Sequence, residues 1–248
     1  MPKIHIKNRD KLIICGLFLS KFDDLAYKSL GFSNFIEAFN ILGLSLQGKP
    51  SNIKNYRDEF DPYFNNTRKG WYQRELRTYT KEIFEQYKDM GFESFKNLVS
   101  SFLIENYEEK LQVSEFLDSK IGTSFIKRVA TGKAAEQYFR ANFMQYFKDF
   151  SLFDSRDFGC GFDFKMQNEK DFYCVEVKGL SEISGNFMLT EKEYNVAQSL
   201  QDKYCLYIVS NLKEKPRENV FFNPIKCFNF AKQSRQITQT SYQGSFNV

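Results

Sequence analysis

The chain has 248 residues, of which 42% are hydrophobic and 27% charged, a balance typical of a globular protein with one large core or two smaller ones. Its net charge of +4 permits a polyanionic partner without requiring one. A single histidine and five scattered cysteines argue against zinc-finger and histidine-dependent hydrolase sites, and no stretch has the P-loop pattern. No apolar run reaches the roughly 18 residues of a membrane span, so we expect a cytoplasmic protein with reduced thiols and no membrane association.

The first half of the sequence predicts helices. Apolar residues recur at helical spacing over residues 8–31 and 33–43, and each segment ends at a glycine, which commonly terminates helices. Further helices are expected over about 51–60, 72–90 and 93–108. No proline-rich linker follows, so the change of pattern alone ends this helical domain, residues 1–118.

The second half alternates between helix and strand patterns. The expected elements, in chain order, are a helix at 131–148, strands at 159–166, 171–179 and 186–190, a helix at 191–201 and a strand at 204–212. This order predicts a compact α/β domain over residues 119–248. The whole chain is therefore expected to be α+β, with a helical N-terminal domain followed by the α/β core.

Asp163 and Glu176 are predicted to face each other across a hairpin. The polar segment "QNEKD" (167–171) suits the turn, and a symmetric hairpin sets the two Cβ atoms roughly 5 Å apart. Two carboxylates at that separation repel each other, whereas a divalent cation between them reverses the interaction, and hard oxygen ligands suit Mg²⁺. Lys178 points to the same face, where it can orient or deprotonate a water or neutralise a phosphate.

These residues resemble the motif of the PD-(D/E)xK nucleases, which share the restriction-endonuclease-like fold. The motif reads "FD" at 162–163 and "EVK" at 176–178, without its leading proline. The flanking segments "GKAAEQYF", "GFDF", "CVEVKG", "FMLTEKEYNVA" and "YCLYIVSN" resemble the NO VEIN carboxy-terminal family over roughly residues 125–212, about a third of the chain.

The resemblance implies a restriction-endonuclease-like core with a mixed central sheet and Mg²⁺-dependent hydrolysis of DNA phosphodiester bonds. It implies that Asp163, Glu176 and the backbone carbonyl of Val177 bind Mg²⁺, while Lys178 activates or positions the attacking water.

Two glutamates are candidates for a further carboxylate at this site. In such folds a glutamate on the first helix often completes the metal site, and Glu136 in "GKAAEQYF" matches that position, although it also suits a solvated helix residue. Glu193 lies in the capping box "TEKE" (190–193), so we expect it to cap its own helix and leave it out of the metal site.

A rival motif is "DFGCG" (157–161), which fits the DxGxG loop of S-adenosylmethionine-dependent methyltransferases. That assignment needs a crossover helix of at least about ten residues before the next strand. Residues 162–172 instead alternate and turn, so the sequence favours the hairpin.

The helical half contains candidate DNA-binding residues. Segments 33–43 and 51–60 have the outline of a helix-turn-helix, with a connection slightly longer than the tightest turn. Basic and aromatic residues are interleaved in "NNTRKGWYQRELR" (65–77), a composition suited to phosphate contact and stacking. The candidates are Asn52, Lys54, Asn55, Arg57, Arg68, Lys69, Trp71, Arg74 and Arg77. The competing interpretation is a packing domain with a basic surface, in which Asp58, Glu59 and Asp61 cap helices and pair with arginines.

The sequence thus predicts a Type II-like restriction endonuclease that cuts double-stranded DNA at specific sites with Mg²⁺. One such site cuts one strand, so we expect a homodimer on DNA. The alternative is a DNA-binding regulator whose nuclease-like domain does not cut, and the intact set of Asp163, Glu176 and Lys178 argues against it.

Overall fold

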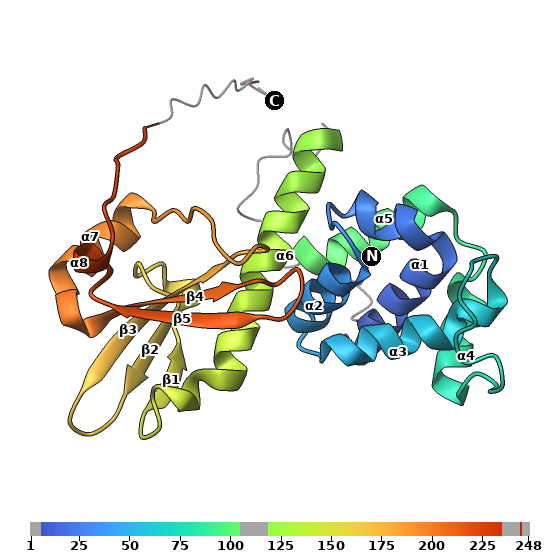
Figure 1. Cartoon of the computed structure of the whole chain (residues 1–248), viewed down its shortest axis with the longest axis horizontal. Coiled ribbons are helices and arrows are strands. Elements are labelled where there is room, and N and C mark those ends of the chain that lie inside the picture. The colour runs from blue at the N-terminus through green and yellow to red at the C-terminus, as the bar shows by residue number, and fades with distance from the viewer. Residues whose placement is uncertain (1–5, 105–118, 235–243, 245–248) are drawn as a thin grey trace, which may run out of the picture.

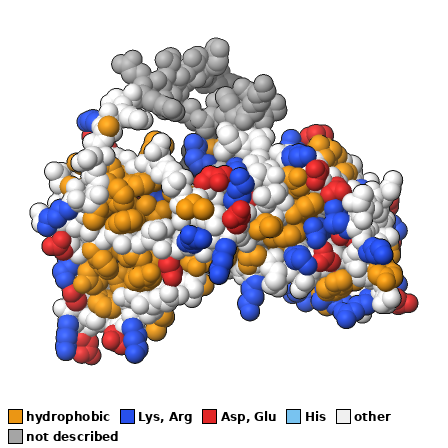
Figure 2. Space-filling model, viewed as in Figure 1, with side chains coloured by type: hydrophobic (Ala, Val, Ile, Leu, Met, Phe, Trp, Pro, Cys, Tyr) orange, Lys and Arg blue, Asp and Glu red, His pale blue; other side chains and the backbone are white. Residues whose placement is uncertain are grey.

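The computed structural model describes residues 6–104, 119–234 and 244. Figure 1 shows a helical half beside a sheet, with the long helix α6 (Ser119–Asn142) standing between them. The predicted α+β fold with a mixed sheet is confirmed. Figure 2 shows a hollow at the lower edge between the two halves, with Lys and Arg side chains on its rim.

The helical half follows the predicted order of helices, with shifted ends. Its helices are α1 (Asn8–Ser29), α2 (Phe35–Ser45), α3 (Pro50–Phe60), η1 (Asp61–Tyr63), α4 (Thr78–Tyr87) and α5 (Phe92–Ile104). The helix predicted over 72–90 begins only at Thr78, because the preceding segment is held as a loop against α3. Trp71 donates its backbone N–H to the Asp58 carbonyl, and Glu59 accepts the backbone N–H of Arg77.

The sheet has five strands in the order β1-β2-β3-β4-β5. They are β1 (Ser151–Asp154), β2 (Phe164–Gln167), β3 (Phe172–Gly179), β4 (Tyr204–Ser210) and β5 (Arg217–Phe222). Only β3 and β4 are parallel, and the crossover between them contains α7 (Glu191–Leu200). The shorter helices are η4 (Phe143–Gln145), η5 (Arg156–Phe158), η6 (Gln201–Lys203) and α8 (Pro224–Cys227).

The strand predicted at 186–190 is wrong, and two strands escaped prediction. Residues 186–190 form no strand, because Phe187 packs edge-on against Phe228 and Phe230 near the C-terminus instead of joining the sheet. The unpredicted strands, β1 and β5, are the two edges of the sheet, where few side chains are buried. An edge strand buries little, so its apolar pattern is weak.

One hydrophobic cluster runs from α1 in the helical half to β4 in the sheet. Helix α6 contributes Ala134, Ala135 and Phe139 to it, packing on α2 with one face and on β3 with another. Polar contacts also cross the halves: Lys127 of α6 pairs with the buried Glu37 of α2 at 2.8 Å, and Asn40 donates to the Leu212 and Glu214 carbonyls. The halves therefore share a core.

The predicted domain boundary at residue 118 falls at the edge of 105–118, outside the described residues, and stays a prediction. Among the described helices, none is both long and apolar enough to cross a membrane.

Candidate active site

The hairpin brings Asp163 close enough to Glu176 for its charge to raise the Glu176 pKa. β2 and β3 pair antiparallel, and their register ends with Phe164 opposite Val175. The Asp163 backbone N–H also donates to the Val175 carbonyl, at 3.0 Å, so Asp163 lies at the end of the ladder and a direct pairing with Glu176 stays a prediction. The hairpin also removes the geometry of a methyltransferase loop, because β2 and β3 are adjacent and antiparallel, with no crossover helix between them.

The Asp163 side chain takes the place of a strand partner. Its Oδ2 accepts the Val177 backbone N–H at 2.9 Å, beyond the last backbone pair of β2 and β3. The N–H and C=O groups of one strand residue point to the same edge, so the Val177 carbonyl is directed to the side on which Asp163 lies. The hydrogen bond thus ties the Asp163 side chain to β3, one residue beyond Glu176.

Glu176 is buried, and Asp163 is half-buried. Glu176 is 3% exposed. Burial raises the pKa of Asp163 to about 7, and the nearby negative charge of Glu136 adds to this shift. Burial likewise raises the pKa of Glu176 to about 9, and the charge of Asp163 adds to it. Each carboxylate is therefore costly to ionise until a positive charge approaches, which is the electrostatic setting of a cation site.

Lys178 lies between two glutamates. Its Nζ donates to Glu176 Oε1 at 2.6 Å and to Glu193 Oε2 at 2.9 Å. Burial by itself would lower the pKa of Lys178, but the two carboxylates outweigh it and raise that pKa above its ordinary value. The side chain is therefore held as an ammonium ion, poised to orient or neutralise rather than to take up a proton.

Glu193 has a second contact that the sequence did not predict. The expected capping box is confirmed, since Thr190 Oγ1 accepts the Glu193 N–H and Glu193 Oε2 accepts the Thr190 N–H. The same Oε2 atom also contacts Lys178. The capping motif alone did not reveal this contact, because it depends on how α7 packs over β3.

Glu136 approaches the carboxylate pair from α6 but is bound to an arginine. It is 8% exposed, and its Oε2 accepts a hydrogen bond from Arg156 Nη1. Burial raises the pKa of Glu136, and the Arg156 charge only partly offsets this. Arg156 also donates to Asp154, which pairs in turn with Arg140 at 2.7 Å. Arg156 escaped the sequence analysis because it lies in the irregular segment after β1, outside any motif.

The donor set at this site fits Mg²⁺ in chemistry, although it is not a closed cage. Asp163, Glu176 and the Val177 carbonyl supply hard oxygen atoms, the type that Mg²⁺ prefers, and Mg²⁺ commonly keeps several waters beside one or two carboxylates. Within the described residues, no three His, Cys, Asp or Glu side chains form a ready-made metal cluster.

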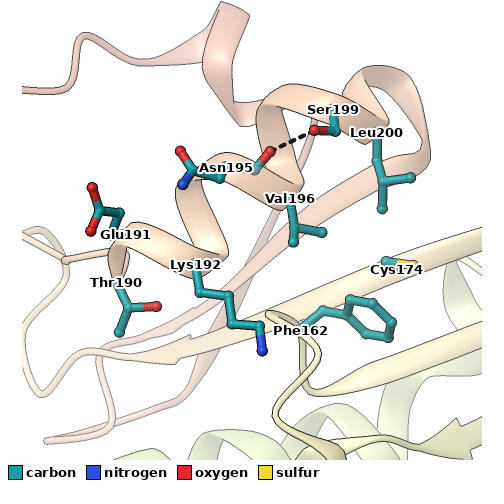
Figure 3. Close-up of a pocket in the computed structure, with 9 residues that line it drawn as sticks. All are labelled: Phe162, Cys174, Thr190, Glu191, Lys192, Asn195, Val196, Ser199 and Leu200. Atoms are coloured by element: carbon teal, nitrogen blue, oxygen red, sulfur yellow. Dashed lines mark hydrogen bonds between the residues drawn. The ribbon is translucent and has the colours of Figure 1, made fainter.

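An open hollow of about 880 Å³ lies along α7, and Phe162 and Cys174 line it from the hairpin (Figure 3). Val196 and Leu200 point from α7 toward Phe162 and Cys174, and Lys192 extends along one side. Phe162 precedes Asp163, and Cys174 lies two residues before Glu176 on the same face of β3. The hollow therefore has an apolar wall next to the segments that carry the two acids.

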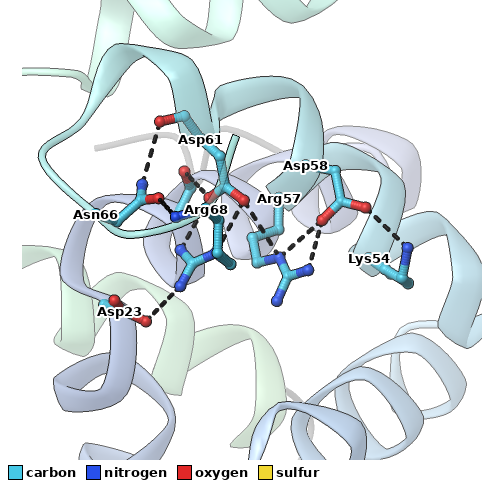
Figure 4. A network of polar contacts seen from close by, with 8 residues as sticks. Asp23, Lys54, Arg57, Asp58, Asp61, Asn66 and Arg68 are labelled. Carbon is cyan, nitrogen blue, oxygen red and sulfur yellow. Dashed lines mark hydrogen bonds and ion pairs between the residues drawn. The ribbon is translucent and has the colours of Figure 1, made fainter. Parts of the chain in front are cut away.

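Three predicted DNA-binding arginines take part in ion pairs within the helical half, and Figure 4 shows two of them, Arg57 and Arg68. Arg57 is 9% exposed, bonds to Asp58 and stacks on Phe35 and Phe39. Arg68 makes two bonds of 2.9 Å to the buried Asp61. Arg77 pairs with the buried Glu59. The expected pairing of Asp58, Glu59 and Asp61 with arginines is confirmed, and a DNA contact by these arginines stays a prediction.

The remaining DNA-binding candidates are more accessible. Lys54 and Asn55 are exposed on α3, with Lys54 paired to Asp58, and Asn52 is half-buried at the start of that helix. Lys69 and Arg74 are exposed, and Arg74 stacks on the half-buried Trp71. The structure collects these residues on the helical half, apart from the carboxylate pair on the sheet.

A comparison with known families matches residues 135–222 to the family described as Protein NO VEIN, C-terminal. The matched segment starts one residue before Glu136, ends with β5, and contains Asp163, Glu176 and Lys178. It covers roughly a third of the chain. No curated protein and no solved structure matches the chain. The predicted likeness to this family is confirmed for the sheet half, and the PD-(D/E)xK assignment stays a prediction.

Proposed function

We propose that the protein is a Mg²⁺-dependent endonuclease that cuts double-stranded DNA at specific sites, as a Type II-like restriction enzyme does. The observation that carries the proposal is the neighbouring pair of Asp163, just before β2, and Glu176, in β3, with the Lys178 ammonium bonded to Glu176. The match of residues 135–222 to a nuclease-like family supports it.

Asp163, Glu176 and the Val177 carbonyl would hold the metal ion. Bound there, Mg²⁺ would polarise the scissile phosphate and lower the pKa of a coordinated water. The protein positions its share of the site in advance, because the Val177 N–H fixes Asp163 and the strand register fixes Glu176. Rigid placement of this kind lowers the entropic cost of reaching the reactive geometry.

Lys178 acts in this proposal as a cation beside the attacking water and the phosphate. Its raised pKa keeps it protonated, so it stabilises developing negative charge on the phosphate oxygens and orients the water. Glu193 holds the Lys178 ammonium from the α7 side. A substrate phosphate would compete with these two glutamates for Lys178 Nζ.

Binding and symmetry complete the proposal. The helical half supplies DNA contacts through the exposed polar and basic residues of α3 and the segment before α4. A single carboxylate site cuts one strand, so a homodimer with two-fold symmetry would cut both strands of a palindromic target.

The test is incubation of plasmid and genomic DNA with the protein, with Mg²⁺ and with EDTA. Discrete fragments that require Mg²⁺ are expected, together with linear plasmid in excess of nicked circles if two subunits act together. A smear would identify a nonspecific nuclease, and accumulation of nicked circles would refute the dimer. Intact DNA that is nevertheless bound would contradict the nuclease and favour the DNA-binding regulator.

A further inference from the structure

A second hollow, of about 750 Å³, lies between the helical half and α6, and we call it the α3–α6 cleft. Lys49 and Asn52 line it from the start of α3, and Gln137, Arg140 and Ala141 line it from the last turns of α6. These elements border the hollow at the lower edge in Figure 1 and Figure 2. The cleft therefore joins the two halves of the molecule.

The polar groups of the cleft suit a nucleic acid. Its lining contains two cationic side chains, Lys49 and Arg140, and no carboxylate. Asparagine and glutamine pair with adenine edges and arginine with guanine edges, so Asn52, Gln137 and Arg140 are base-reading types, whereas a lysine suits a phosphate. A cavity that brings three such amide and guanidinium groups together from two elements has the composition of a base-contacting surface.

The cleft is also coupled to the candidate active site. Gln137 follows Glu136 directly, and Arg140 lies about one helical turn beyond it, roughly 5–6 Å away at Cβ. Arg140 pairs with Asp154, Asp154 with Arg156, and Arg156 with Glu136. The cleft and the candidate active site therefore share α6 and are linked by this chain of ion pairs.

We propose that the α3–α6 cleft receives the edge of a DNA duplex, with Asn52, Gln137 and Arg140 contacting bases and Lys49 contacting a phosphate. This inference rests on the proposed function and names its specificity-determining residues. It assigns different roles to two asparagines of α3: Asn52 lines the cleft and is expected to contact a base, whereas Asn55 does not line it. It also assigns base contacts to the helix that carries Glu136.

The test uses a pool of short duplexes with a randomised centre, selected in EDTA so that binding occurs without cutting. One enriched duplex and its scrambled counterpart then serve as probes in fluorescence anisotropy. Asn52→Ala and Gln137→Ala should each weaken binding to the enriched duplex by about 5- to 150-fold and leave binding to the scrambled duplex unchanged. Lys49→Ala should weaken both alike and lower the slope of log Kd against log salt concentration by about 0.9.

Matched control variants are Gln145→Ala and Arg128→Ala, which remove an exposed glutamine and an exposed α6 arginine outside the cleft, and both should bind as the wild type does. The inference is overturned if the wild type enriches no duplex, or if Asn52→Ala and Gln137→Ala bind the enriched duplex normally. It is also overturned if Asn55→Ala loses the preference as fully as Asn52→Ala. A wild type that binds selectively but does not cut with Mg²⁺ refutes the nuclease and leaves the cleft standing.

Discussion

At the scale of single residues, Asp163 and Glu176 carry the strongest electrostatic conflict in the site. Glu176 is buried and Asp163 half-buried, and loss of solvent contact raises the pKa of Asp163 to about 7 and that of Glu176 to about 9. A group whose pKa is higher in the folded than in the unfolded protein stabilises the fold below its unfolded pKa and loses this contribution as pH rises through the folded value. The pair therefore destabilises the metal-free protein increasingly above about pH 4.

This conflict predicts how stability depends on pH. The melting temperature of the metal-free protein should fall between about pH 5 and about pH 9, and Mg²⁺ should restore it most at the alkaline end. Glu176→Gln removes one of the two charges, so it should flatten the fall and remove most of the Mg²⁺ effect. Thermal unfolding followed by circular dichroism measures both. Parallel curves for wild type and variant would contradict a repelling pair.

Lys178 gives a second prediction at this scale. Removing one group that stabilises developing negative charge costs roughly 10²–10³-fold in rate, so Lys178→Ala should lower the cleavage turnover by that order. Mg²⁺ binding should persist because an ammonium ion is not a ligand, which calorimetric titration can check. Lys203→Ala is the matched control, since Lys203 is a partly exposed lysine paired with Asp171 away from the site. Equal turnover in wild type and Lys178→Ala would remove the lysine from the mechanism.

At the scale of elements, the close approach of α6 to β3 sets the geometry of the site. A Cβ atom added at Gly179 would lie 2.6 Å from the Thr131 carbonyl oxygen of α6. Only glycine therefore lets the strand with Glu176 and Lys178 pack directly on the helix with Glu136. The contact is between backbone and backbone, so no side-chain movement relieves an added methyl group.

Two glycine-to-alanine substitutions distinguish the effect of this close packing on stability from the effect of helix propensity. Gly179→Ala should destabilise the protein by about 1–3 kcal/mol, as overpacking does, and lower cleavage because β3 moves relative to α6. Gly132→Ala lies on α6, where an added Cβ meets nothing within 4 Å, so it should stabilise the protein by about 0.5–1 kcal/mol. Urea unfolding measures both changes. A neutral Gly179→Ala would show that the two elements can separate without cost.

The hairpin was predictable because its information is local. The turn segment 167–171 fixes the register of β2 against β3, with Phe164 opposite Val175, and so brings the neighbouring Asp163 close to Glu176. The contacts of Glu193 with Lys178 and of Arg156 with Glu136 were not predictable, because they join elements brought together only by tertiary packing. Sequence motifs therefore predict contacts within one supersecondary unit, such as this hairpin, but not contacts between separate units.

At the scale of the whole molecule, α6 makes the helical half and the sheet a continuous body. Sequence patterns predicted two consecutive domains, since periodicity changes from helical to alternating after residue 118. They could not show that the helical half and the sheet both pack on α6. A helix that is apolar on two faces lacks the single apolar stripe from which its buried side is predicted. Ion pairs across the interface follow from this packing.

The pair of Lys127 and Glu37 tests the shared core. Glu37 is fully buried, and Lys127 Nζ lies 2.8 Å from its Oε1. Lys127→Ala leaves a buried carboxylate without its cation and should cost about 3 kcal/mol of unfolding free energy, the low end for a broken buried pair because the lysine is partly exposed. The neighbouring Arg128→Ala, on the exposed side of α6, should change stability by less than about 0.5 kcal/mol. Similar values for the two variants would show that the interface contributes little.

The central claim is that Asp163 and Glu176 hold the metal ion with which the protein cuts DNA. The most direct measurement is the initial rate of Mg²⁺-dependent plasmid cleavage by the wild type, Asp163→Asn and Glu176→Gln, with DNA binding measured in EDTA on the same samples. The account predicts cleavage by the wild type, none by either variant, and equal binding by all three. Cleavage by either variant at near the wild-type rate would contradict it.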